Sequence, residues 1–166
     1  ISLSETAHTE AILALLVKYG IDDPAAGNPA GVFTDPYLQA LYDTLIAMGS
    51  PTLIDALKVG ALIEETDIRD INAKKVVTDE ADILTVYDSL LCGSQSHLRA
   101  FNSQLLGLGV NYVPQVITQA EWDAYRRQQI EQLRQQIPDL DPKMLDSAEM
   151  KKESLERLIR ERGPRR

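Results

Sequence analysis

The chain has 166 residues, of which 44% are hydrophobic and 5% aromatic, which suits one aliphatic core plus an appendage. Its formal net charge of −8 disfavours nucleic-acid binding, and its single cysteine excludes an internal disulfide framework and a cysteine-based zinc cluster. No run approaches about 18 apolar residues, so we expect no membrane span. The cysteine, Cys92, lies in an apolar helical stretch, where we expect it to be a small core residue.

Apolar residues recur at helical spacing along most of the chain, which predicts an all-α protein without strands. Asp35 and Ser50 stand at expected helix N-caps, Gly20 follows the first helix, and Thr118 with Glu121 forms a capping box. The expected helices cover residues 4–19, 36–48, 51–75, 79–106, 118–136 and 141–162.

The chain is expected to divide into a helical bundle, residues 1–117, and a C-terminal helical extension, residues 118–166. Within the bundle, helices 51–75 and 79–106 should pack antiparallel because their connection is short. The extension has sparse apolar positions, so it should pack on the outside or against another subunit. Because the numbering begins at Ile1 rather than Met, we expect a processed product or a fragment, consistent with a secreted or cell-envelope location.

The chain has two histidines, and both belong to patterns that could bind a metal. Glu5 precedes His8 by three residues, so their side chains point the same way and could bind one ion or adjacent ions. Such spacing also arises by chance, and a capping or surface role is the alternative. His97 falls on the expected buried face of its helix, where it is either a ligand or a hydrogen-bonded core residue.

The third expected helix carries acidic residues near its apolar stripe. Glu64 interrupts that stripe, and a buried carboxylate is costly unless it is coordinated or paired, so Glu64 is either a ligand or half of an ion pair. Glu65 precedes Arg69 by four residues, which favours a surface salt bridge. Asp67 could reach the edge of the same face, but a solvent-facing charge is the simpler interpretation.

Three helices thus each present a ligand-type side chain on an inward face, which predicts that Glu5, His8, Glu64 and His97 converge on a metal site. Carboxylate and imidazole without thiolate suit iron, manganese or zinc. Paired carboxylates inside a helical bundle favour a two-metal iron or manganese centre.

Around these residues the sequence resembles an uncharacterised family of prokaryotic ferritin-like domains, a domain of unknown function. The resemblance covers residues 1–125 and is carried by Ser4–His8, Ala56–Ile68, Gly93–Phe101 and Tyr112–Gln115. It implies a ferritin-like antiparallel four-helix bundle with a di-metal site, for which iron is the expected metal. In this resemblance Glu5 and His8 match the second family helix, Glu64 (with Glu65 as the alternative) the third, and His97 the fourth.

The sequence departs from the family pattern at two points. The first family helix, which is acidic, would lie before Ile1 and is absent here. Ser94 stands where the fourth helix usually has Glu, so one bridging carboxylate is missing. Either Glu65 or Asp67 substitutes for it, or the site holds one metal or none.

Three functions follow from these patterns. The first is a metal-binding protein with a redox or iron-handling role. The second is a non-enzymatic assembly module, because a bundle that lacks one helix leaves a hydrophobic groove for self-association or for a partner that supplies the helix. The third is a helical scaffold with a degenerate metal site. An enzymatic role and a purely structural role both remain open.

Overall fold

The structure, a computed structural model, describes residues 2–136, which form five helices and no strand. The expected all-α class is confirmed for this part of the chain. The helices are α1 (Ser2–Tyr19), α2 (Pro36–Gly49), α3 (Leu53–Lys75), α4 (Ala81–Gly107) and α5 (Gln119–Gln136). The sixth expected helix, residues 141–162, lies outside the described residues. Among the described helices, none is long and apolar enough to cross a membrane.

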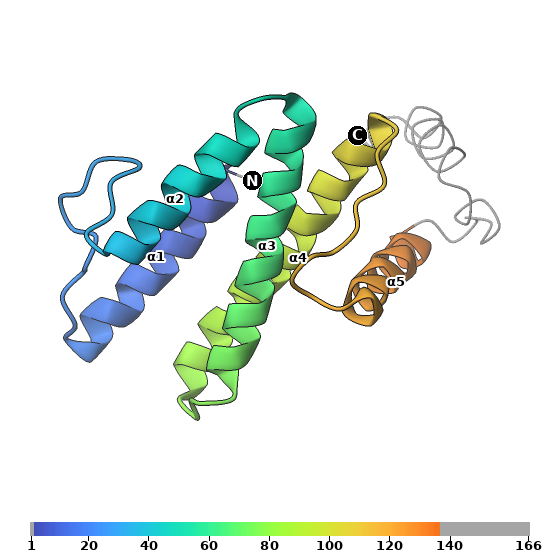
Figure 1. Ribbon diagram of the computed structural model, residues 1–166. Coiled ribbons are helices and arrows are strands. Elements are labelled where there is room, and N and C mark those ends of the chain that lie inside the picture. Colours follow the sequence, from blue (N-terminus) through green and yellow to red (C-terminus); the bar gives the residue numbers. More distant parts are fainter. Residues whose placement is uncertain (1, 137–166) are drawn as a thin grey trace, which may run out of the picture.

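The long helices α3 and α4 run antiparallel at the centre of the molecule and make its most extensive helix–helix contact (Figure 1). Of the helices before them, α2 contacts α3 and α1 contacts α4. Figure 1 shows α1 and α2 on one side of the central pair and α5 on the other. This arrangement places one end of α1 beside the middle of α4, where the candidate site lies.

Capping residues explain where two of the helices begin. Asp35 accepts hydrogen bonds from the backbone of the first turn of α2, as the sequence predicts. The expected cap of α3, Ser50, is wrong: Ser50 instead follows α2, with its N–H bonded to Ile46 O. The N-cap of α3 is Thr52, whose extended backbone directs Oγ1 toward the N–H of Asp55 at 3.1 Å.

The described core is small and lies mainly between α3 and α4. Gly60 lets the two helices approach closely, because the ring of Phe101 occupies the space where a Cβ at position 60 would lie. Trp122, in the first turn of α5, is 2% exposed and belongs to the same core. The expected core position of Cys92 is wrong, because this residue is exposed on α4. The buried apolar residues are Ala61, Ile68, Leu98, Leu105, Tyr112, Ile117 and Trp122.

A buried carboxylate, Glu65, holds the segment between α4 and α5 against α3. Its oxygens accept hydrogen bonds from the hydroxyl of Tyr112 and from the successive backbone N–H groups of residues 115–117, at 2.7 to 2.9 Å for Oε2. Successive N–H groups of this kind form a concave cradle for an anion. The expected surface salt bridge from Glu65 to Arg69 is therefore wrong, and Arg69 pairs with Asp70 at 2.8 Å.

Candidate metal centre

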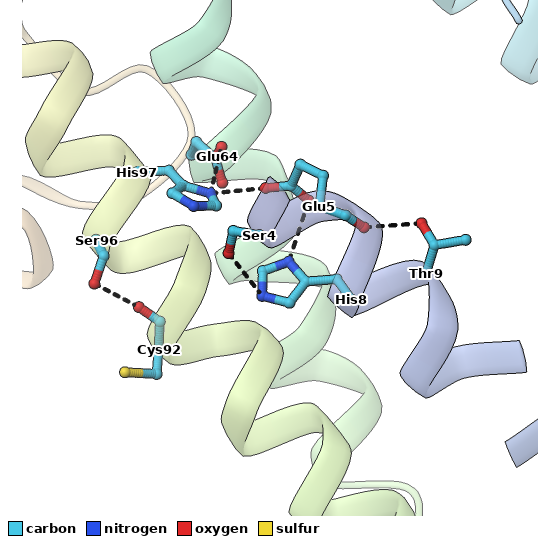
Figure 2. Close-up of polar contacts among 8 residues, drawn as sticks. All are labelled: Ser4, Glu5, His8, Thr9, Glu64, Cys92, Ser96 and His97. Atoms are coloured by element: carbon cyan, nitrogen blue, oxygen red, sulfur yellow. Dashed lines mark hydrogen bonds and ion pairs between the residues drawn. The ribbon is translucent and has the colours of Figure 1, made fainter. Parts of the chain in front are cut away.

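Three helices bring the predicted site residues to one place (Figure 2). Glu5 and His8 lie one turn apart on α1, Glu64 is buried in the middle of α3, and His97 is buried in α4. The ligand atoms of Glu5, Glu64 and His97 all lie within 4.8 Å of one another. We call these three residues the carboxylate–histidine cluster.

His97 lies at the centre of this cluster. Its Nδ1 atom is 2.8 Å from Glu5 Oε1 and 3.3 Å from Glu64 Oε1. Nevertheless, Nδ1 is the buried side-chain polar atom that lacks a hydrogen-bond partner in the described part of the chain. Both carboxylate oxygens lie within ion-pair distance of Nδ1, but neither forms a hydrogen bond with it. A cation held by both carboxylates would lie beside this unpaired nitrogen.

His8 lies beside the cluster. Its Nδ1 atom is 3.1 Å from Glu5 Oε2, and its Nε2 atom is 3.5 Å from Ser4 Oγ. The centroids of the His8 and His97 rings are 5.9 Å apart. Glu5 therefore lies between the two imidazoles, with one carboxylate oxygen toward each.

The cluster is buried on the α3 and α4 side and open on the α1 side. The side chains of Glu64 and His97 are 7% and 9% exposed, whereas that of Glu5 is 49% exposed. His8 is intermediate at 17%. Solvent therefore reaches the cluster mainly at Glu5.

Burial changes the protonation of both buried members of the cluster. Burial raises the pKa of Glu64 to about 8, and the nearby Asp67 and Glu5 carboxylates raise it further, against a lowering hydrogen bond from Ser94. Burial lowers the pKa of His97, an effect that the charge of Glu5 partly offsets. Both shifts favour the uncharged forms of Glu64 and His97 in the metal-free cluster, which avoids unpaired buried charge.

Asp67 lies at the outer edge of the site. It is exposed, as its sequence position predicts, but partial burial raises its pKa to about 6, with Glu5 and Asp70 raising it and His8 lowering it. Asp67 thus lies near enough to Glu5 and His8 for both to shift its pKa, although it does not belong to the carboxylate–histidine cluster.

Two residues of α4 shape the site although the sequence analysis assigned them no positive role. Ser94, noted only as the replacement for a family glutamate, is buried and hydrogen-bonds Glu64. Gly93 lies beneath the ring of His8 and was missed. Its signal in the sequence is a glycine within a long helix, which costs about 1 kcal/mol relative to alanine and usually has a packing reason.

The donor set has a definite chemical preference. Two carboxylates and a neutral imidazole, without thiolate, suit iron, manganese or zinc, and the unpaired Nδ1 of buried His97 lies close to oxygens of both carboxylates. The described residues therefore fit a divalent metal better than an organic cofactor.

The chain is similar to known proteins in sequence and in structure. One family match, to the SurA-like N-terminal domain, covers residues 107–163 and extends beyond the described residues. The uncharacterized protein MJ0754 of Methanocaldococcus jannaschii is 43% identical over 123 residues, which span 74% of this chain and 66% of that protein. The crystal structure of hypothetical protein MJ0754 superposes with a TM-score of 0.73 at 42% identity, and covers 75% of this chain and 71% of that one. The model of the uncharacterized protein domain DUF2202 matches residues 1–129, so the chain belongs to this family.

Proposed function

We propose that the chain is a ferritin-like metal-binding protein whose carboxylate–histidine cluster holds iron, singly or as a pair, with manganese or zinc as the alternatives. Its role is then redox chemistry or iron handling. The observation that carries this proposal is the orphaned Nδ1 of buried His97, which lies 2.8 and 3.3 Å from two carboxylate oxygens on two other helices. An unpaired polar atom in a buried site is costly unless a ligand satisfies it.

Glu5, Glu64 and His97 would hold the metal, and His8 would join them or orient Glu5. Bound iron would supply electron transfer or oxygen chemistry at this position. The side chains of the protein determine the protonation of the metal site. Glu64 would bind in its deprotonated form, which the hydrogen bond from Ser94 favours.

Elemental analysis of protein purified without chelators tests the proposal. We expect near-stoichiometric iron, manganese or zinc in the wild type and loss of that metal in His97→Ala and Glu5→Gln. The matched control is Glu10→Gln, which neutralises an exposed carboxylate on the same helix but outside the cluster. Circular dichroism should show unchanged helix content in each variant. Equal, negligible metal in the wild type and His97→Ala would contradict the proposal and favour a scaffold with a degenerate site.

A second candidate function, assembly, is favoured by the surface of α2. This helix has no buried residue, although it carries six large apolar side chains that are exposed. Exposed apolar surface of this extent usually marks an interaction site. The chain would then self-associate or accept a partner helix over α2, and its mass in solution separates this candidate from a monomeric metal protein. The exposed residues are Tyr37, Leu38, Leu41, Tyr42, Ile46 and Met48.

A further inference from the structure

Gly93 leaves space on α4 that the imidazole of His8 fills. A Cβ at position 93 would lie 2.4 Å from Cε1 and 2.5 Å from Nε2 of His8, distances at which something must move. The backbone does not require glycine here, because Gly93 lies inside α4 and its φ is not positive. Since glycine weakens a helix interior, we attribute the glycine at this position to the space that it leaves for the His8 ring.

His8 connects this space to the cluster. Its Nδ1 atom contacts Oε2 of Glu5 at 3.1 Å, which leaves Oε1 of the same carboxylate toward His97 Nδ1 at 2.8 Å. A chain of contacts therefore runs from Gly93 through His8 and Glu5 to His97. Figure 2 shows both imidazoles flanking Glu5 between α1 and α4.

Helix α1 depends on such contacts for its placement. None of residues 3–19 is buried, so α1 lies against the bundle through half-buried side chains. Far from the cluster, Lys18 and Tyr19 bond Asp82 of α4 at 2.5 and 2.9 Å. Later residues of α1 thus meet earlier residues of α4, and His8 on Gly93 fits the same antiparallel register.

We propose that Gly93 is a positioning residue, which accommodates His8 and through it fixes the carboxylate of Glu5 opposite His97. The carboxylate–histidine cluster is then complete only when α1 lies on α4 in this register. The contact chain is a property of the metal-free protein, whereas its consequence for metal binding rests on the proposed function.

The test adds a methyl group at position 93 and then shortens the His8 side chain that this methyl group would contact. Gly93→Ala should push the His8 ring away, because a terminal side chain moves more easily than a helix backbone. In His8→Asn, the amide nitrogen can take the place of Nδ1, and nothing takes the place of Cε1 and Nε2. The double variant H8N/G93A should therefore restore the orientation of Glu5. Gly49→Ala is the matched control, since a Cβ there meets its neighbours at 3.4 to 3.6 Å.

Two measurements are made on each variant. The first is the imidazole NMR spectrum of the metal-free protein, in which two histidines give two assignable ring signals. The second is the affinity for zinc ion. We expect G93A to displace the His97 signal and weaken zinc binding about 10- to 100-fold, the usual effect of losing an orienting contact. Adding G93A to H8N should change neither, and G49A should match the wild type.

The outcomes separate this inference from the proposed function. An unchanged His97 signal in G93A, or an equal loss of zinc affinity with and without the His8 ring, would overturn the positioning role. If the wild type binds no metal but G93A displaces the His97 signal only when His8 is present, the positioning role stands and the metal site is wrong. Should G93A fail to fold, a folded H8N/G93A protein supports the proposal and an unfolded one overturns it.

Discussion

Glu64 and Glu65 are adjacent on α3, yet they meet different partners because successive helical residues point roughly 100° apart. Glu64 faces Glu5 and His97, whereas Glu65 faces the backbone of residues 115–117. The sequence identified Glu64 as the buried carboxylate of interest, because it interrupts an apolar stripe. It could not reveal the role of Glu65, because backbone N–H groups about fifty residues away leave no mark in a residue pattern.

Replacement of Glu65 by glutamine should destabilise the chain by about 3–5 kcal/mol, because it weakens several hydrogen bonds to a buried carboxylate that contribute roughly 1.5–3 kcal/mol each. The amide group of glutamine would present a donor to N–H groups that are themselves donors. Urea unfolding measures the loss.

The matched control for this substitution is Tyr112→Phe, which removes one hydroxyl donor to Glu65 and should cost about 2 kcal/mol. Burial, followed by the bond to Glu65, raises the pKa of Tyr112, so this hydroxyl remains a donor over the accessible pH range. Equal effects of the two substitutions would mean that the backbone bonds to Glu65 contribute little.

At the scale of elements, the sequence predicts the described helices because periodicity and caps are local signals. Errors are confined to ends: α3 begins after Thr52 rather than Ser50, and α4 begins at Ala81 rather than about Asp79. The seating of α1 on α4 could not be predicted, because it depends on space left by Gly93. Local patterns describe a helix face, but not what a neighbouring helix places against it.

The capping box of α5 gives a pH-dependent prediction. Glu121 accepts bonds from the N–H and hydroxyl of Thr118 at 2.7 and 2.6 Å, and these bonds lower its pKa. A lowered folded-state pKa adds stability above the unfolded value, near pH 4.5, that is lost as pH falls through the folded value. Glu121→Gln should therefore cost about 0.5 kcal/mol at pH 7 and less at pH 3.

Urea midpoints at the two pH values measure this difference. Thr118→Ala serves as the comparison, because Thr118 Oγ1 also accepts the N–H of Glu121 at 3.2 Å, a bond that does not depend on charge. We expect Thr118→Ala to cost stability at both pH values. A pH-independent effect of Glu121→Gln would show that the charge of the carboxylate is not what stabilises the helix end.

At the scale of the whole molecule, apolar surface is distributed unevenly. The described core lies between α3, α4 and the start of α5, while α2 exposes most of its large apolar side chains. The sequence predicted helical faces for burial but not which faces a single chain leaves uncovered. That information depends on the arrangement of all helices together, and for α2 it favours association.

We expect the wild-type chain to have a solution mass above that of a monomer, measured by light scattering. The double substitution Y37E/I46E places two charges on the exposed apolar surface of α2 and should yield the monomer mass. V76E/V77E introduces the same charges at exposed apolar positions after α3 and should leave the mass unchanged. A wild type that is monomeric at every concentration would rule out self-association over α2.

The position of Trp122 gives the molecule a built-in optical reporter. It is the sole tryptophan of the chain, is almost fully buried, and lies edge-on to Tyr112 with ring centroids 6.5 Å apart. Tyr112 bonds Glu65, the sequence neighbour of Glu64, so the indole is linked to α3 through two side chains. Its fluorescence should shift to longer wavelength whenever the segment before α5 separates from α3. Separation of this segment from α3 can thus be followed in unlabelled protein by the fluorescence of a single residue.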